Sequence, residues 1–277
     1  MSKLRLGRIA FINVAPIYYA LENNILNHNF ELIADVPSHL NEMMCQGQLD
    51  LSACSCLEYA RRWRRYYLAE DLCIASNGPV MSVLLLSQKP LTQLDGAEIL
   101  ISGQSHTSVI LTQLLLKERM QVEATIRIGH VSMELAKGHE PCAFLAIGDE
   151  ALKFAKHPKY PYVLDLAEAW HSWTGLPFVF AVWIISRQSY QAGHFQQDPS
   201  IPLRASRDYG LQHLDLCIDS VEKCTPLDRA ALKIYYQQAL NYKLGPEELK
   251  GLQLFYQKIA NHGFISEVPE LNFYPTK

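Results

Sequence analysis

The chain lacks the long hydrophobic runs and the excess of one charge that mark membrane proteins and nucleic-acid-binding proteins. None of its apolar runs reaches the roughly 18 residues needed to cross a bilayer. Its formal net charge at pH 7 is -3, whereas binding to nucleic acids or anionic membranes generally needs a strongly basic surface. We therefore expect neither nucleic acid nor membrane as a partner, and any anionic ligand must be held by local dipoles and a few charges.

Cysteine is present in an odd number, seven, and several of the seven lie inside apolar runs. This pattern favours reduced, buried thiols over a disulfide framework.

The basic start of the chain and the apolar run at 9–21 are similar to an export signal. However, Asn13 and Pro16 interrupt the run, and no small-residue cleavage site precedes the polar residues 22–24. We therefore expect a cytoplasmic protein.

The motifs of several common chemistries are also missing. There is no His-Glu-x-x-His and no paired cysteine set at zinc spacing, so we expect no metal. There is no Gly-x-Ser-x-Gly elbow for a nucleophilic serine and no glycine-rich dinucleotide fingerprint. The polar segment 102–108 lacks the Gly-Lys-Ser/Thr ending of a nucleotide loop. We expect no cofactor.

The chain has the composition of an ordinary globular protein, and strand patterns alternate with helix patterns along it. With 277 residues, 49% of them hydrophobic, the chain can form about two lobes. Alternation of strands and helices in the first half predicts a mainly parallel sheet. Ser38 is predicted to cap the second helix. The predicted strands lie near 6–11, 30–36, 49–54 and 80–87, and the helices near 16–24, 38–46 and 57–65.

A second alternating unit follows the turn at 88–96. The nearly continuous apolar segment 176–186 is typical of a strand that is buried on both faces or that crosses between lobes. We predict an α/β fold in which residues 1–87 and 178–277 form a discontinuous lobe 1 with C-terminal helices and residues 88–177 form an inserted lobe 2. Such folds bind ligands between the lobes. The second unit is predicted to have strands at 98–102, 125–128 and 142–147, helices at 107–120 and from Asp149, and consecutive helices at 203–263.

Polar residues occupy four junctions where a strand pattern gives way to a helix pattern. In α/β sheets such junctions face the ligand crevice, with free N–H groups and a positive partial charge. Structural alternatives stay open: Asn13 also fits a helix cap or a turn, Ser105 or Thr107 fits a helix cap, and the hydroxyl of Ser82, after the turn at 77–79, fits a bond to backbone. The junctions are Asn13 before Pro16, Cys54-Ser-Cys56, Ser102 to Ser108, and Gly148-Asp149.

Taken together, these motifs resemble the chorismate dehydratases of the futalosine route to menaquinone. The resemblance implies an α/β, two-lobed, periplasmic-binding-protein-like type II fold with an interlobe cleft. The chain departs from the family pattern at Cys54-Ser-Cys56, where a Ser-Ser pair is usual, at Asn77, where Asp is usual, and at His106, where a small residue is usual. The segments that carry the resemblance are 7–16, 47–50, 57–60, 78–85, 107–109, 147–152, 173–181 and 242–248.

The activity implied by the resemblance is the loss of water from chorismate, a small dicarboxylate, to give 3-[(1-carboxyvinyl)oxy]benzoate. We hypothesise that a substrate carboxylate takes the proton from C3 while Asn13 orients the leaving hydroxyl, with His106 as the alternative base. The resemblance implies Asn13 and Ser82 as catalytic residues near the ring, Ser55, Ser105, Thr107 and Ser108 as carboxylate binders, and His106, Gly148 and Asp149 as further cleft residues.

Two rival functions fit the same fold. A solute-binding protein for a small carboxylate needs no catalysis, but it would be exported, which the cysteines and the missing signal disfavour. The naphthoate-forming enzyme of the same pathway shares the fold and has a different first strand motif. Both a monomer and a homodimer are consistent with the sequence.

Overall fold

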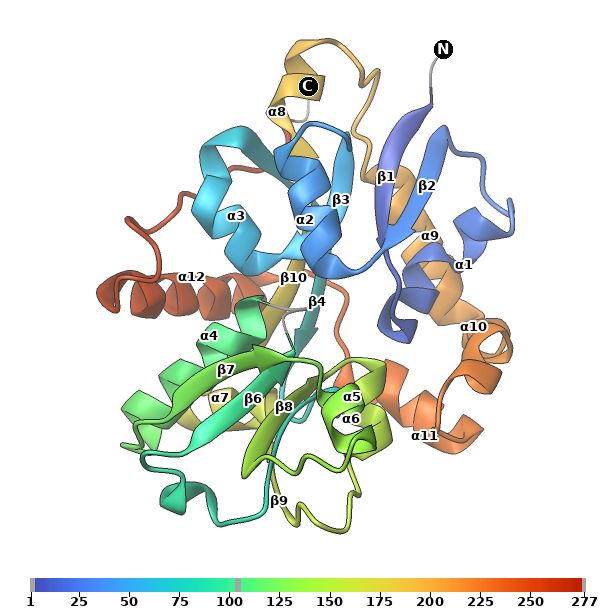
Figure 1. Cartoon of the computed structure of the whole chain (residues 1–277). Coiled ribbons are helices and arrows are strands. Elements are labelled where there is room, and N and C mark those ends of the chain that lie inside the picture. Colours follow the sequence, from blue (N-terminus) through green and yellow to red (C-terminus); the bar gives the residue numbers. More distant parts are fainter. Residues whose placement is uncertain (1–2, 103–105, 276–277) are drawn as a thin grey trace.

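Two five-stranded sheets divide the structure, one in the upper half and one in the lower half of the view in Figure 1. The computed structural model describes residues 3–102 and 106–275. The upper sheet has the order β2 (Phe30–Asp35), β1 (Leu4–Ile9), β3 (Leu51–Ser55), β10 (Phe178–Ser186), β4 (Tyr66–Ser76). The lower sheet has the order β7 (Thr125–Gly129), β6 (Glu98–Ser102), β8 (Ala143–Ile147), β5 (Val83–Ser87), β9 (Tyr162–Asp165).

Both sheets are mixed: four strands of each run in one direction, in line with the expectation of a mainly parallel sheet, and one strand runs against them. β1 is parallel to β2 and β3, whereas β10 is antiparallel to β3 and β4. In the lower sheet β6 is parallel to β7 and β8, whereas β5 is antiparallel to β8 and β9. The antiparallel strands flank the two places where the chain crosses between the sheets. Their direction is therefore set by the crossings and not by a strand-helix-strand unit.

The first crossing lies between Ser76 and Val83, where β4 ends and β5 begins. The sequence pattern places residues up to 87 in lobe 1, but β5 pairs with β8 and β9 in the sheet of lobe 2. The turn after Ser87 shows where a strand ends. It gives no information about which sheet that strand joins, so the boundary at 87 was placed in the wrong lobe. The second crossing lies just before β10, at the boundary expected near residue 178.

Helices lie on both sheets, and α12 lies between the two halves in Figure 1. Ser38 does not cap its helix, because Val36 precedes α2 and Pro37 occupies its first turn. The long helix expected at 107–120 is α4 followed by a π-helical turn, Leu115–Arg119. The α-helices are α1 (Ala15–Glu22), α2 (Pro37–Cys45), α3 (Cys56–Arg62), α4 (His106–Leu114), α5 (Val131–Ala136), α6 (Asp149–Phe154), α7 (Leu166–Thr174), α8 (Arg187–Gln191), α9 (Ile201–Gln212), α10 (Leu214–Val221), α11 (Arg229–Ile234) and α12 (Pro246–Asn261).

Two strands have no counterpart in the sequence prediction. β4 contains the charged pair Glu70-Asp71, and Asp71 has a positive φ of 54°, which breaks the alternation of a regular strand. The pairing of β4 with β10 shifts register at two places. β9 has only four residues, too few for a clear pattern.

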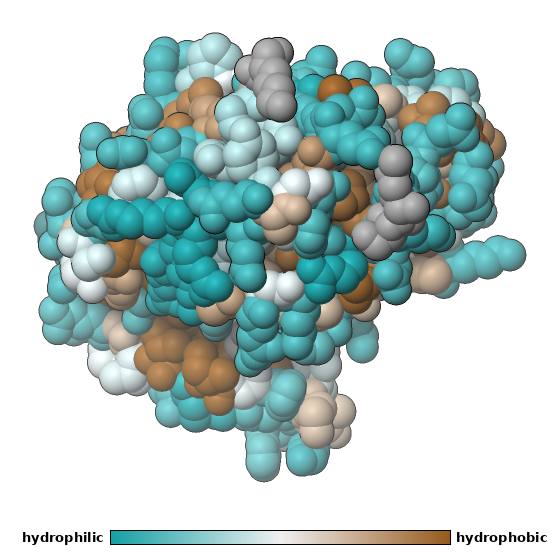
Figure 2. Space-filling view, turned by 90° about the horizontal axis from the view of Figure 1, so that it is seen from above, coloured by the Kyte–Doolittle hydropathy of each residue, from teal (hydrophilic) through white to brown (hydrophobic). Residues whose placement is uncertain are grey.

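One cluster of buried apolar side chains continues from lobe 1 into lobe 2. It includes Leu51 and Trp183 of the upper sheet together with Leu85 and Ile101 of the lower sheet. On the face seen in Figure 2, hydrophilic residues dominate and hydrophobic residues form separate patches. Within the described residues no helix is both long and apolar enough to span a membrane. The shared core holds the two lobes against each other around the pocket described next.

Candidate active site

Residues of both lobes line a pocket at the carboxyl ends of their central strands. The space between its walls that no atom fills amounts to about 560 Å³, including space that is open to solvent. Its walls combine aromatic and aliphatic side chains with an amide and hydroxyls. The polar lining consists of Asn13, Ser55, Ser82 and Ser108, together with the backbone of Gly148; the apolar lining includes Phe11, Ile74, Val80, Phe180 and Leu240.

Asn13 lies in the short 3₁₀ turn Ile12–Val14 that connects β1 to α1. Its side chain caps neither this turn nor α1, so a helix-capping Asn is wrong, whereas the alternative of a turn residue is confirmed. The Oδ1 atom of Asn13 is buried and has no hydrogen-bond partner within the described part of the chain. A buried amide oxygen without a partner costs free energy unless a ligand or water satisfies it. The pocket therefore presents an acceptor that fits a ligand hydroxyl.

Tyrosines from the C-terminal part of the chain hold the backbone around Asn13. The Tyr236 hydroxyl donates to the Ile12 carbonyl at 2.8 Å, and the Tyr242 hydroxyl donates to the Asn13 carbonyl at 2.7 Å. Tyr235 shares a side-chain hydrogen bond with Ser82. Sequence reasoning missed these tyrosines as parts of the site. The one indication in the sequence was that Tyr242 begins the segment 242–248, which is among those that carry the family resemblance.

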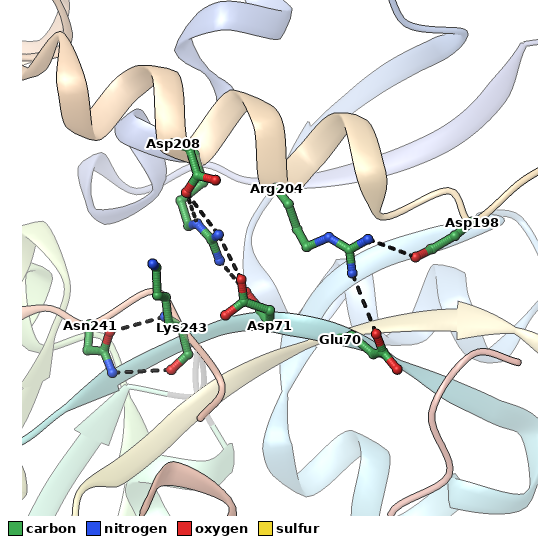
Figure 3. Close-up of polar contacts among 8 residues, drawn as sticks. Glu70, Asp71, Asp198, Arg204, Asp208, Asn241 and Lys243 are labelled. Carbon is green, nitrogen blue, oxygen red and sulfur yellow. Dashed lines mark hydrogen bonds and ion pairs between the residues drawn. The ribbon is translucent and has the colours of Figure 1, made fainter. Parts of the chain in front are cut away.

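Hydrogen bonds within the chain hold the turn that presents Tyr242. In Figure 3 the Asn241 side chain bonds both backbone groups of Lys243, at 3.2 Å to the carbonyl oxygen and 3.1 Å from the N–H. Asn241 also donates to Glu248 at the start of α12. These bonds flank Tyr242 on both sides and fix where its hydroxyl points.

Helix α9 supports the same segment from the other side. A Cβ at Gly210 would lie 2.0 Å from the Pro16 carbonyl oxygen, so only glycine allows α9 to approach the start of α1 this closely. Salt bridges attach α9 to β4. Arg207, almost fully buried, pairs with Asp71 at 2.8 Å, and Figure 3 shows Arg204 between Asp198 and Glu70.

Ser82 lies in the first crossing, immediately before β5. Its hydroxyl donates to the Val80 carbonyl at 3.3 Å, and its own carbonyl accepts the Gly148 N–H at 2.7 Å. The hydroxyl thus bonds the backbone, as one sequence alternative holds, and also lines the pocket. Both statements about Ser82 are compatible, because a hydroxyl also has two acceptor lone pairs.

Ser55 caps α3 by accepting the Glu58 N–H at 3.2 Å, and Asn41 donates to its Oγ at 3.2 Å. Burial raises the pKa of the neighbouring Cys56 thiol to about 12. The thiol is therefore neutral, which excludes a thiolate nucleophile at this position.

Residues Thr107 and His106 lie outside the pocket lining. The Thr107 Oγ1 is fully buried and accepts the Leu57 N–H at 3.3 Å, so this lobe 2 residue caps a lobe 1 helix. The His106 side chain is exposed, and its pKa is lowered by desolvation and by the charges of Arg61 and Arg62. Ser105 lies outside the described residues.

Gly148 and Asp149 form the corner between β8 and α6. Gly148 has φ +62°, and a Cβ there would lie 3.2 Å from the Phe11 ring. Burial raises the pKa of the Asp149 carboxyl, and the nearby Ile12 N–H lowers it in part. Its Oδ1 is buried and has no partner among the residues described. Asp149 itself does not line the pocket.

Relatives with assigned activities match almost the whole chain. It is 29% identical over 270 residues to the chorismate dehydratase of Thermus thermophilus, covering 92% of this chain and 94% of the relative. It is 27% identical over 256 residues to the chorismate dehydratase of Campylobacter jejuni, covering 90% and 94%.

The fold is also found among solved structures. The periplasmic aliphatic sulphonate binding protein of Escherichia coli superposes with a TM-score of 0.69 at 11% identity, covering 100% of this chain and 93% of that chain. This confirms the predicted periplasmic-binding-protein-like α/β fold. A family model described as menaquinone biosynthesis matches residues 4–261. With a match over nearly its entire length, the chain belongs to the menaquinone biosynthesis family.

Proposed function

We propose that this protein is a chorismate dehydratase, a carbon–oxygen lyase that converts chorismate into 3-[(1-carboxyvinyl)oxy]benzoate and water. Family membership and two relatives with this name support the proposal. All seven cysteines are free, which agrees with a reducing compartment and with the expected cytoplasmic location. The substrate is the small-molecule partner.

The reaction breaks the C3–H and C4–O bonds of chorismate. A base takes the C3 proton, the electron pair of that bond forms the C3–C4 double bond, and the C4 hydroxyl leaves and collects a proton to become water. The ring becomes aromatic, so much of the driving force belongs to the substrate. The protein then needs mainly to hold the ring and carboxylates in a reactive orientation.

The pocket residues suit this task. Asn13 orients the C4 hydroxyl through its amide, and Ser82 contacts the ring from the opposite lobe. Ser55 and Ser108, at the starts of α3 and α4, bind the carboxylates, where hydroxyl donors and helix N–H groups favour an anion. The apolar rings of Phe11 and Phe180 enclose the substrate ring. A substrate carboxylate takes the C3 proton, since the described residues of the pocket lining include no His, Glu or Asp.

The single observation that carries these roles is the buried, unpartnered Oδ1 of Asn13 in the pocket wall. The test mixes purified protein with chorismate and follows the loss of the diene absorbance, with product identified by mass. We expect turnover by the natural chain and a loss of roughly 100-fold or more in kcat for Asn13→Ala, since orientation of reacting groups contributes at least this much.

His106→Ala serves as the companion variant. If a substrate carboxylate is the base, this variant keeps kcat within about 3-fold, because general-base catalysis by a side chain is worth roughly 10²–10⁴-fold. A large loss of kcat in His106→Ala would identify His106 as the base that takes the C3 proton. Binding of chorismate without consumption would identify a binding protein of the same fold.

A further inference from the structure

We propose that Asp165, at the end of β9, is a positioning residue: its carboxylate holds Met81 in a left-handed conformation and thereby places Ser82 in the pocket wall. The inference rests on the proposed function, because it concerns how Ser82 reaches the substrate ring. It goes beyond that function by giving a role to a side chain that does not line the pocket.

The first observation is the backbone conformation of Met81, in the first crossing between the lobes. Its φ is 63°, and it is one of four non-glycine residues with a positive φ in the described part of the chain. Asn24 and Asp71, two of the others, have short polar side chains that suit this conformation, whereas methionine has none. Such a conformation persists only where the surrounding structure holds it.

The second observation is the contact that holds Met81. The Asp165 Oδ2 accepts the Met81 N–H at 2.7 Å. The other oxygen, Oδ1, caps α7 by accepting the N–H groups of Ala167 at 3.0 Å and Glu168 at 3.2 Å. A helix cap needs only one side-chain oxygen, so the bond to Met81 is a separate task of the same carboxylate. The Asp165 backbone is fixed in turn, because it pairs with Leu84 between β9 and β5.

The third observation connects Met81 with the pocket. The Ser82 hydroxyl donates to the Val80 carbonyl at 3.3 Å, and this bond spans Met81. Val80 and Ser82 both line the pocket, whereas Met81 between them does not. Rotation of Met81 to a negative φ would therefore break the bond and turn the Ser82 hydroxyl away from its present direction. The Ser82 carbonyl is held independently, by the Gly148 N–H at 2.7 Å.

The first test is Asp165→Ser. Serine retains a cap for α7, but its shorter side chain has no second oxygen for the Met81 N–H. We expect kcat with chorismate to fall roughly 10- to 100-fold, as for a small misplacement of a reacting group, with KM changed less than about 3-fold. Asp228→Ser is the matched control, because Asp228 caps α11 through the Ala231 N–H at 2.8 Å and does not line the pocket. It should leave kcat unchanged, and the Tm of both variants is compared.

The second test asks whether Asp165 acts through Met81. Glycine adopts a positive φ at no steric cost, so Met81→Gly removes the need for a group that holds this conformation. We expect Asp165→Ser to lower kcat less than about 3-fold when it is made in the Met81→Gly variant, a strong coupling between the two positions. Loss of a cap on α7 alone would lower kcat equally in both backgrounds.

Amide hydrogen exchange, followed by NMR, supplies a readout that needs no activity. The Met81 amide should exchange faster in Asp165→Ser and at the natural rate in Asp228→Ser. Unchanged exchange at Met81, or an equal loss of kcat with and without Met81→Gly, would overturn the inference. If the natural chain does not consume chorismate, the proposed function fails, and the exchange experiment still decides whether Asp165 holds Met81.

Discussion

Two contacts link the lobes beside the pocket, and they differ in kind. Each lies at the start of a lobe 2 helix and meets the start of a lobe 1 helix or turn. Thr107 of α4 accepts the N–H of Leu57 in α3, whereas the corner of Gly148 and Asp149 before α6 lies against the Phe11 ring, where a Cβ on Gly148 would be 3.2 Å from ring atoms. The corresponding strands, β6 and β8, occupy the same relative places in the lower sheet as β1 and β3 in the upper one.

The chemical difference between the two contacts separates two functions. Thr107 is neutral and fully buried, and its neighbours Ser55 and Ser108 are the hydroxyls that we propose for the carboxylates. The corner with Asp149, which is ionisable, contacts Phe11 in the segment that leads to Asn13, the residue we propose for the reacting hydroxyl. We therefore expect the Thr107 contact to affect mainly substrate binding and the corner to affect mainly turnover.

Gly148→Ala should have the largest effect, because it changes the corner formed by Gly148 and Asp149. The new Cβ meets the Phe11 ring and also forces alanine into a left-handed conformation, which costs about 1–2 kcal/mol. We expect kcat/KM for chorismate to fall roughly 100-fold as the corner moves. Gly138→Ala is the control, because Gly138 has φ +80° and open space around it. It should lower Tm and leave kcat/KM unchanged; equal losses in both variants would contradict the role of the corner.

Thr107→Val tests the other contact. Valine has nearly the same shape but leaves the buried Leu57 N–H without an acceptor, which destabilises the fold by about 1–3 kcal/mol. We expect KM for chorismate to rise about 10-fold, equivalent to about 1.4 kcal/mol of binding, with a smaller change in kcat. Thr107→Ser, which keeps the hydroxyl, should restore KM. A change confined to kcat would remove the distinction between the two contacts.

Tyr242→Phe should give a smaller effect on the Asn13 side. It removes the donor to the Asn13 carbonyl, a net loss of about 0.5–1.5 kcal/mol in stability, and we expect a few-fold decrease in kcat. Tyr59→Phe, outside the pocket lining, removes the donor to the Glu270 carbonyl at 2.6 Å and the acceptor of the Asn272 N–H at 2.9 Å. Similar Tm shifts with a kcat change only in Tyr242→Phe would separate positioning from stability.

The smallest effect concerns pH, because Asp149 titrates and Thr107 does not. Burial raises the pKa of Asp149, so folding favours its protonated form. This contribution to stability is present below the ordinary carboxyl pKa of about 3.9 and is lost as pH rises through the raised value. Relative to Asp149→Asn, the natural chain should therefore lose Tm as pH rises over that window. A Tm difference independent of pH would show that Asp149 is not shifted.

The sequence was sufficient for the fold and for the polar part of the pocket lining. Asn13, Ser55, Ser82 and Ser108 come together because strand ends of an α/β sheet share one edge, and a pattern along the chain locates those ends. The sheet to which residues 83–87 belong was not predictable in this way, because a buried apolar strand fits either sheet. For the same reason, the apolar pattern of β10 did not predict that this strand runs antiparallel to its neighbours.

The residues that hold the pocket lining in place were harder to predict from the sequence. Thr107 has the pattern of a cap, and it does cap a helix, but the helix belongs to the other lobe. Tyr236 and Tyr242 lie in the last fifth of the chain, and nothing local connects them with residues 12 and 13. Such contacts depend on how the lobes and the C-terminal helices are packed, which no short window of sequence records.

The hydrogen bond from Tyr242 to the Asn13 carbonyl joins residues 229 positions apart. Strands β1 to β10 all precede Tyr242 along the chain, so the two sheets are encoded before the residue that holds the Asn13 turn. We therefore expect a chain that is shortened after β10 to keep the strands of both sheets and to lose this support of the pocket wall.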